Sequence, residues 1–228
     1  MTTPIIVALD FETKEEALFL AKKLDPQLCR LKVASTLFTR YGPDLIEALR
    51  LLGFDIFLDL KYHDIPKQVA VACKQAAQLG VWMLTLHASG GEAMMTAARD
   101  AVEGVPGTRP LLVGVTVLTS LSDADLIQIG YKDNVVDSVL NLAKLAKASG
   151  LDGVVSSAAE ASALRHALGD DFVLVTPGIR LPGNSSDDQK RVVTPEAALA
   201  AGSNYLVIGR AITQAPEPVV VLQQILNM

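Results

Sequence analysis

Cysteines, basic residues and aromatic residues are all scarce in this sequence of 228 residues, and each shortage excludes a class of protein. Only two cysteines occur, Cys29 and Cys73, and they lack the close spacing of a metal-binding pair. We therefore expect no cysteine-ligated metal, and we interpret both residues as small buried side chains in a reducing compartment.

Positive charge is also in short supply. Lysine and arginine together number 20, against 25 aspartates and glutamates, so the formal net charge is −5. A protein that binds nucleic acid needs positive charge to neutralise the phosphate backbone, and we therefore predict no nucleic-acid partner. A small anionic ligand is still compatible with this balance, because a few local Lys and Arg side chains suffice to bind one.

Long hydrophobic runs are absent. No apolar stretch approaches the roughly 20 residues that a membrane span needs. The N-terminal segment, MTTPIIVALDFETKEE, lacks the basic start of a signal peptide, and its short apolar run ends in an aspartate. We therefore predict a cytoplasmic protein with no membrane partner, whose first apolar run is a β-strand.

The core must be aliphatic. Aromatic residues make up 5% of the sequence, whereas half of all residues are hydrophobic, so Val, Ile, Leu and Ala have to fill the interior. This composition suits parallel strands that are buried on both faces and covered by helices. No Ser/Gly linker or low-complexity stretch divides the chain, and we expect one domain spanning residues 1–228.

Short apolar runs alternate with segments of helical period along the chain. The predicted strands cover residues 4–10, 30–35, 55–61, 83–87, 111–118, 153–156, 173–176 and 205–209. The predicted helices cover residues 14–24, 43–52, 66–79, 92–102, 135–148, 158–167, 195–200 and 216–226. Thr13 and Thr194 are the expected N-caps of the first and seventh of these helices.

Strict alternation of strand and helix calls for a parallel sheet with helices packed outside it. Eight such units in 228 residues fit a closed (β/α)8 TIM barrel better than an open doubly wound sheet. The open sheet would also need a glycine-rich dinucleotide motif after the first strand, where the sequence reads LDFETKEE. We therefore predict an α/β fold of the TIM-barrel class.

Charged residues gather where the predicted strands end, which is where a barrel of this kind has its active site. Asp10 ends the first strand, Lys32 lies in the second, and Asp59 and Lys61 lie two apart in the third, on one face. Desolvating such charges costs several kcal/mol per ion unless each is paired, and function is the usual reason for accepting the cost. Asp64 adds a carboxylate in the loop above the barrel.

A phosphate site is predicted after the last two strands, the usual place for one in this fold. The long segment VTPGIRLPGNSSDDQ follows the seventh strand, contains Gly178, Arg180 and Gln189, and has the features of a lid. The eighth strand ends at Gly209 and Arg210, which offer close backbone approach and a guanidinium fork for phosphate oxygens.

The segment 57–66, FLDLKYHDIP, resembles the D-x-K-x-x-D motif, followed by Ile-Pro, of orotidine 5'-monophosphate (OMP) decarboxylases. Other segments agree in order and spacing, namely ALD at 8–10, LKV at 31–33, VTVLTS at 115–120, TPGIR at 176–180, DDQ at 187–189 and IGR at 208–210. The resemblance covers essentially the whole chain and is strongest to the short bacterial forms. The first motif alone also occurs in barrel enzymes that act on sugar phosphates, but the combination is highly specific.

This resemblance implies a role for each matched residue. Lys61 is the expected proton donor and Asp59 is expected beside the substrate carboxylate; Lys32, Asp59, Lys61 and Asp64 of a second subunit together would form an alternating charged array. Asp64 and Ile65 are expected to reach the active site of a second subunit in a homodimer. The remaining implied substrate contacts are Asp10 and Lys32 to the ribose, Thr119 to the pyrimidine, Pro177 in the TPGIR loop, and Arg180, Gln189, Gly209 and Arg210 to the phosphate. The implied reaction turns OMP into UMP and CO2 and needs no metal or organic cofactor.

Two alternatives fit parts of the sequence. The first is a metal-dependent sugar-phosphate decarboxylase or aldolase of the same barrel type, which would bind a divalent metal with the acidic residues of the third strand. The second is a barrel that binds a nucleotide without catalysis, which would have no need of Lys61 between two carboxylates. His63 and His87 could also act in acid–base chemistry, but we interpret both as structural.

Overall fold

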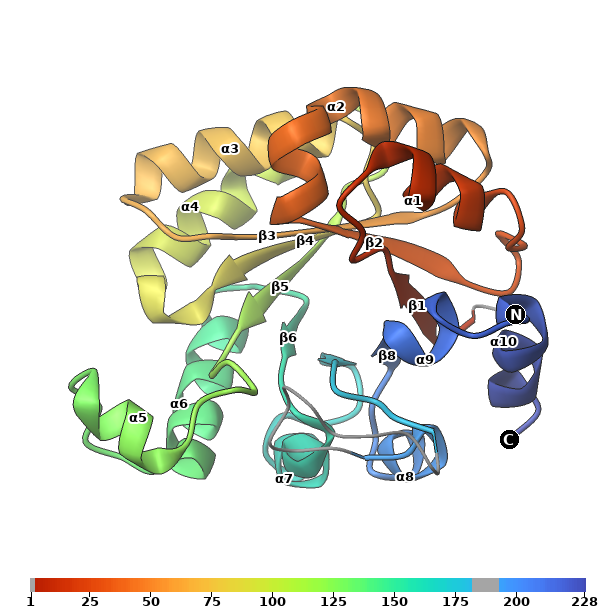
Figure 1. Ribbon diagram of the computed structural model, residues 1–228. Coiled ribbons are helices and arrows are strands. Elements are labelled where there is room, and N and C mark those ends of the chain that lie inside the picture. The colour runs from red at the N-terminus through yellow and green to blue at the C-terminus, as the bar shows by residue number, and fades with distance from the viewer. Residues whose placement is uncertain (1–2, 182–192) are drawn as a thin grey trace.

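The computed structural model describes residues 3–181 and 193–228 and contains a closed barrel of eight parallel strands (Figure 1). Neighbouring strands pair in chain order, and β8 pairs with β1 to close the barrel. The strands are β1 Ile5–Ala8, β2 Arg30–Ala34, β3 Ile56–Tyr62, β4 Met83–His87, β5 Leu111–Val115, β6 Gly153–Val155, β7 Val173–Thr176 and β8 Tyr205–Ile208. The prediction of a (β/α)8 TIM barrel is confirmed.

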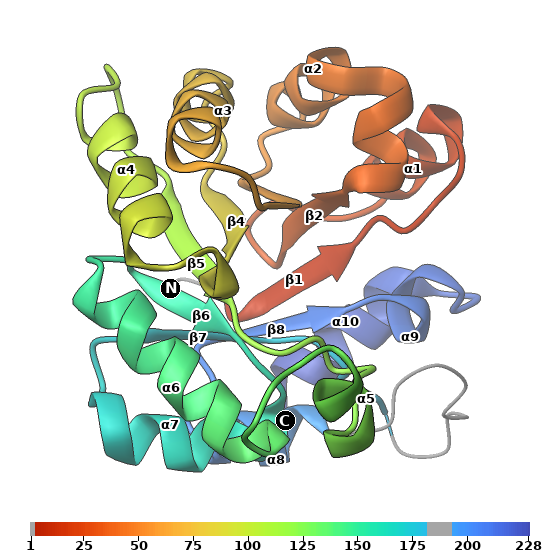
Figure 2. The ribbon, with the colours of Figure 1, turned by 90° about the vertical axis from the view of Figure 1, so that its left-hand side faces the viewer.

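Helices surround the barrel, and their faces that contact it are apolar. The longer ones are α1 Lys14–Ala21, α2 Ser35–Leu51, α3 Pro66–Gln78, α4 Glu92–Glu103, α6 Val135–Ala148, α7 Ala161–Leu168 and α10 Pro218–Leu226, and the shorter ones are α5 Asp123–Gln128, α8 Pro195–Ala200, α9 Arg210–Thr213 and the 3-10 turns η1 Ala88–Gly90 and η2 Ala158–Glu160. Figure 2 shows α3 and α4 side by side on the outer surface. Every helix in the described ranges is too short or too polar to cross a lipid bilayer.

The side chains form two cores, as the doubly buried strands require. The larger core lies between the strands and the helices and is almost entirely aliphatic. The smaller core fills the inside of the barrel with Ile6, Ala8, Phe57, Met83, Val113, Val175 and Val207. Phe57 is the one aromatic residue of this inner cluster, so the predicted aliphatic interior is confirmed for the part of the chain that the structure describes.

A buried arginine lies at the end of the barrel at which the strands begin. The Arg30 guanidinium lies 4.2 Å from the ring centre of Trp82 and 5.3 Å from that of Tyr205. Its Nε donates to the Asp55 carboxylate at 3.2 Å. Cation–π contacts of this kind become stronger when water is excluded, and we refer to these contacts of Arg30 as the Arg30 plug.

The second predicted helix is present, but a helical piece before it was missed. The sequence places Pro43 at the first turn of a helix, whereas the helical segment α2 already begins at Ser35. Gly42 adopts φ 54° and ψ −145°, so the chain kinks there and Pro43 starts a second helical piece. The short helices α5 and α9 were not predicted, whereas α8, which is as short as α5, was predicted with the Thr194 N-cap and Pro195 at its start.

The predicted N-caps are confirmed. The Thr13 side chain accepts a hydrogen bond from the backbone of Glu16 in a complete capping box, and the Thr194 side chain accepts one from the Ala197 backbone. Both caps start helices that follow loops at the same end of the barrel, and they help to fix where those loops leave the strands.

Candidate active site

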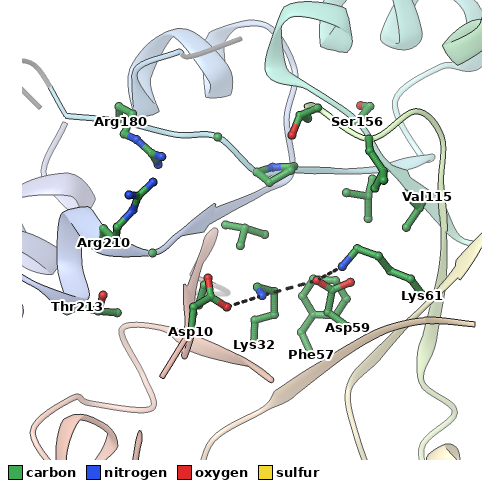
Figure 3. Close-up of a pocket in the computed structure, with 18 of the residues that line it drawn as sticks. Asp10, Lys32, Phe57, Asp59, Lys61, Val115, Ser156, Arg180, Arg210 and Thr213 are labelled. Atoms are coloured by element: carbon green, nitrogen blue, oxygen red, sulfur yellow. Dashed lines mark hydrogen bonds and ion pairs between the residues drawn. The ribbon is translucent and has the colours of Figure 1, made fainter. Parts of the chain in front are cut away.

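A cavity of about 530 Å³ opens at the end of the barrel where the strands finish (Figure 3). The residues that line it come from the ends of several strands and from the loops that follow them, as the TIM-barrel architecture predicts. The sequence-predicted site residues that line it are Asp10, Lys32, Asp59, Lys61, Thr119, Pro177, Arg180, Gly209 and Arg210. One cavity therefore contains residues that lie up to two hundred positions apart in the chain.

Four charged side chains of alternating sign form a line across the floor of the cavity. The Lys32 Nζ lies 3.1 Å from the Asp10 carboxylate and 3.6 Å from that of Asp59. The Lys61 Nζ lies 2.7 Å from the same Asp59 oxygen, Oδ2. In Figure 3 the dashed lines run from Asp10 through Lys32 and Asp59 to Lys61. We refer to these four side chains as the charged array.

The inner members of the array are desolvated and the outer members are open. The side chains of Lys32 and Asp59 are 9% and 11% exposed, whereas those of Lys61 and Asp10 are 35% and 61% exposed. A buried charge is tolerated when an opposite charge and hydrogen bonds compensate it, and here each inner charge has a partner on both sides. The exposed fraction of Lys61 leaves its ammonium accessible from the cavity.

The array holds Asp59 in its ionised form. Burial acts to raise the pKa of the Asp59 carboxyl group, but the positive charges of Lys32 and Lys61, with hydrogen bonds from Lys61 and Thr85, outweigh it. The pKa of Asp59 therefore lies below its usual value of 3.8. The cavity thus contains a fixed negative charge next to a lysine ammonium at neutral pH.

The backbone leaves regular strand geometry at Lys61. Its φ of 53° is the one positive value at a non-glycine residue within the described chain. Leu58 of β3 pairs with Leu84 of β4, and the next pair is Tyr62 with Leu86. The three residues 59–61 of β3 therefore lie opposite the single residue Thr85 of β4, which makes a bulge. Such a conformation costs about 1–3 kcal/mol and persists where the surroundings impose it, often at functional sites.

Two arginines define the other side of the cavity. Arg180 follows β7 and Arg210 begins α9, and Figure 3 shows their guanidinium groups pointing toward one another, away from Lys61. Gly178, at φ 81°, and Gly209 line the wall beside them. Two converging guanidinium groups repel each other unless an anion lies between them, and this arrangement therefore suits a phosphate.

Apolar residues line the wall beyond Lys61. They are contributed by the fifth and sixth strands and the segments after them, and include Val115, Val117 and Val155. Sequence reasoning missed these residues and also Phe11, in the loop after β1, and Ser156, which directly follows β6. The Ser156 hydroxyl is buried and has no hydrogen-bond partner in the part of the chain that the structure describes. Its position after a strand end was the signal that could have identified it.

Three predicted residues do not line the cavity of this chain or cannot be placed in it. Asp64 and Ile65 lie in the exposed loop between β3 and α3, and Ile65 is 64% exposed. The Asp64 carboxylate accepts a hydrogen bond from the Ile65 backbone at 2.6 Å. Gln189 lies outside the described residues.

The two histidines of this region are in contact. The ring centres of His63 and His87 lie 5.3 Å apart. Burial, followed by the charges of His63 and Lys61, lowers the pKa of His87 below 6.5, although the Asp59 carboxylate acts in the opposite direction. His87 is therefore neutral at pH 7.

Metal ligands are not clustered in the described chain. Within residues 3–181 and 193–228, no group of three or more His, Cys, Asp or Glu side chains is arranged to hold a metal ion. Asp59 is the carboxylate of the third strand that would bind a metal ion first. It already forms ion pairs with two lysines and accepts a hydrogen bond from Thr85.

Comparisons with known proteins agree with the site. The family described as "Orotidine 5'-phosphate decarboxylase / HUMPS family" matches residues 3–225. A Neisseria meningitidis protein named orotidine 5'-phosphate decarboxylase is 58% identical over 98% of this chain and 91% of its own length. A protein of the same name from Hydrogenovibrio crunogenus is 56% identical over 97% of this chain and 93% of its own. The crystal structure of orotidine 5'-phosphate decarboxylase from Lactobacillus acidophilus superposes with a TM-score of 0.88 at 40% identity, covering 99% of this chain and 98% of that one.

Proposed function

Since the chain belongs to the orotidine 5'-phosphate decarboxylase / HUMPS family, we propose that it decarboxylates OMP to UMP and CO2, the last step of de novo UMP synthesis. The observation that carries the proposal is the Lys61 ammonium, which lies 2.7 Å from Asp59 and is open to the cavity. The anion site between Arg180 and Arg210 lies on the opposite side, as a nucleotide with a phosphate at one end requires.

The chemistry explains why such an array is useful. When the bond between C6 of the pyrimidine and its carboxyl carbon breaks, CO2 leaves and the electron pair stays on C6. This carbanion has no adjacent carbonyl to delocalise it as a simple enolate, so preorganised charge has to stabilise it. Lys61 supplies a positive charge and then a proton to C6, and UMP is formed. Asp59, next to the departing carboxylate, disfavours the bound substrate relative to the transition state.

The remaining site residues bind parts of the substrate that do not react. In this proposal Asp10 and Lys32 contact the ribose hydroxyls, Thr119 contacts the pyrimidine, and Pro177 lies against the substrate. Arg180, Gly209 and Arg210 hold the phosphate together with Gln189, which a closing segment would supply. Contacts far from C6 provide binding energy that can be used at the reacting carbon. No metal or organic cofactor is required.

We further propose that two copies of the chain share their active sites. Asp64 and Ile65 lie on a loop just past the end of β3, outside the cavity of their own chain. Ile65 is a large apolar side chain that is 64% exposed, so it is available for contact with a second subunit. In a two-fold dimer each loop would lie over the other subunit's cavity, and each Asp64 would extend the partner's charged array.

The sugar-phosphate alternative is less favoured by the geometry. A divalent metal at the third strand would have to displace the ammonium groups of Lys32 and Lys61 from the Asp59 carboxylate. A barrel that only bound nucleotides would gain nothing from the strained backbone that presents Lys61.

One assay tests the proposal and both alternatives. Purified protein is mixed with OMP, and the loss of OMP absorbance is followed with and without EDTA. We expect turnover that is unaffected by the chelator. Tight UMP binding without turnover would support a non-catalytic barrel. Absence of OMP turnover together with metal-dependent turnover of a sugar phosphate would support the sugar-phosphate alternative, and OMP turnover that EDTA abolishes would contradict the cofactor-free reaction proposed here.

A further inference from the structure

One buried hydroxyl connects two members of the charged array. Thr85 lies in β4 and is fully buried. Its Oγ1 donates a hydrogen bond to the Asp59 Oδ1 at 3.0 Å and accepts one from the Lys61 backbone N–H at 2.8 Å. A single side chain therefore contacts both the carboxylate of Asp59 and the backbone that carries the Lys61 ammonium.

The position of Thr85 explains the unusual backbone of β3. The stretch from Asp59 to Lys61 bulges out of register opposite Thr85, and Lys61 adopts a positive φ. In a regular ladder a backbone carbonyl would accept the Lys61 N–H, but here the Thr85 hydroxyl accepts it instead. An N–H shielded from water is costly to leave without an acceptor, so this bond stabilises the bulge that presents Lys61.

The same hydroxyl fixes the orientation of the Asp59 carboxylate. Oδ2 of Asp59 lies near both Lys32 and Lys61, and Oδ1 accepts the bond from Thr85. A carboxylate held through both oxygens cannot rotate about its last side-chain bond without losing a hydrogen bond. Thr85 thereby sets which oxygen faces the two ammonium groups.

Other buried threonine hydroxyls at the strand ends have a different partner. The Thr116 Oγ1 donates to the Val155 carbonyl at 3.0 Å, and the Thr176 Oγ1 donates to the Tyr205 carbonyl at 3.1 Å. Both bonds join neighbouring segments of the barrel and involve no charged group. Thr176 does not line the cavity and is as fully buried as Thr85, which makes it a matched control.

We infer that Thr85 is a positioning residue for the decarboxylation, because its hydroxyl holds the Asp59 carboxylate and the Lys61 backbone in a fixed relative geometry. This inference rests on the proposed function. Thr85 does not line the cavity, so it acts on the reaction through Asp59 and Lys61 and makes no contact with the substrate.

The test compares three variants. Thr85→Val keeps the shape and removes the hydroxyl, Thr85→Ser keeps the hydroxyl, and Thr176→Val makes the same chemical change away from the array. We expect Thr85→Val to lower kcat by at least about tenfold while the dissociation constant for UMP changes little. Thr85→Ser should retain most of the activity, and Thr176→Val should keep kcat near that of the wild type. If Thr85→Val does not fold, Thr85→Ala takes its place, because it also removes the hydroxyl and adds no apolar group next to the Asp59 carboxylate.

A second readout does not depend on turnover. The Asp59 carboxyl group is titrated by carbon-13 NMR and identified by comparison with Asp59→Asn. Loss of the Thr85 hydrogen bond should raise the pKa of Asp59 in Thr85→Val, and Thr176→Val should leave it where it is in the wild type. Failure of the wild-type protein to decarboxylate OMP would refute the proposed function, whereas the titration would still test the bond to Asp59. Equal losses of kcat in Thr85→Val and Thr176→Val, or an unchanged Asp59 pKa, would overturn the inference.

Discussion

The Lys61 ammonium lies 2.7 Å from the Asp59 carboxylate, although a bulge interrupts the strand between the two residues. In a regular strand, side chains two positions apart point to the same face, and the sequence predicts this pair on that basis. The contact is therefore achieved by a distorted backbone, and both the chemistry and the stability of the protein should respond to changes at Lys61.

Lys61→Ala should abolish turnover and leave the fold intact. The side chain is the group placed to stabilise and protonate C6, and its removal should lower kcat by at least about a thousandfold, or about 4 kcal/mol of barrier. Circular dichroism checks the fold, and Lys22→Ala, which removes an exposed lysine of the outer surface, is the control. Activity within about tenfold of the wild type, or about 1.4 kcal/mol, would mean that Lys61 is not the proton donor.

Lys61→Gly should be more stable than Lys61→Ala. Both variants remove the ammonium, but glycine adopts a positive φ without steric cost and alanine does not. We expect a higher Tm for the glycine variant, with an advantage of about 1 kcal/mol, and no activity in either. If alanine proved the more stable, the strain would not lie in the backbone at this position.

Arg210→Ala should reduce kcat/KM for OMP on the order of a hundredfold, because a charge-assisted bond to the phosphate is lost. Orotidine, which lacks the phosphate, serves as the comparison substrate and should be nearly indifferent to the substitution. Similar losses for both substrates would show that Arg210 supports the structure and does not bind the phosphate.

Mixing two inactive proteins should restore activity if sites are shared. In a heterodimer of Lys61→Ala and Asp64→Ala subunits, one site has both defects and the other has neither. Statistical exchange places such dimers at half of the total, so about a quarter of wild-type activity should return. Exchange is verified by mass spectrometry of differently tagged subunits. Complete exchange without recovered activity would show that Asp64 acts within its own chain.

The thermal stability of the protein should fall as the pH drops below 7, in part because of His87. Burial and the charges of His63 and Lys61 lower its pKa below the usual 6.5 in the folded state. At a pH between the lowered pKa of the folded state and the usual value of 6.5, the unfolded chain binds a proton at His87 more readily than the folded protein does. Acid therefore favours unfolding. His87→Gln should flatten the decline of Tm from pH 7 to pH 5, whereas His166→Gln, on the exposed surface of α7, should not. Parallel curves for the wild type and His87→Gln would contradict this assignment.

Most of the fold and the polar residues of the cavity could be predicted from the sequence. The aliphatic runs identified the eight strands, and the rule that barrel sites lie at strand ends identified Asp10, Lys32, Asp59 and Lys61 as neighbours. Arg180 and Arg210 were found in the same way. The roles of these residues in the reaction remain predictions that the experiments above address.

The bulge at Lys61 could not be predicted. A positive φ is normally indicated by glycine, and residues 59–61 read Asp-Leu-Lys. Thr85, on the neighbouring strand, accepts the displaced backbone N–H and so stabilises the bulge, and such a contact between strands leaves no mark on the local sequence. The helical piece from Ser35 to the kink at Gly42 was also missed, although Pro43 was read correctly as the start of the piece that follows the kink.

The Arg30 plug has a consequence for how this scaffold can change over evolutionary time. Its contacts with Trp82, Tyr205 and Asp55 lie at the end of the barrel opposite the cavity, with the inner cluster around Phe57 and Met83 between them. The residues of the plug are therefore separate from those that line the cavity. Variation in the loops at the mouth can alter selectivity without disturbing the plug, and a mutagenesis library aimed at new substrates should vary the mouth and keep the plug constant.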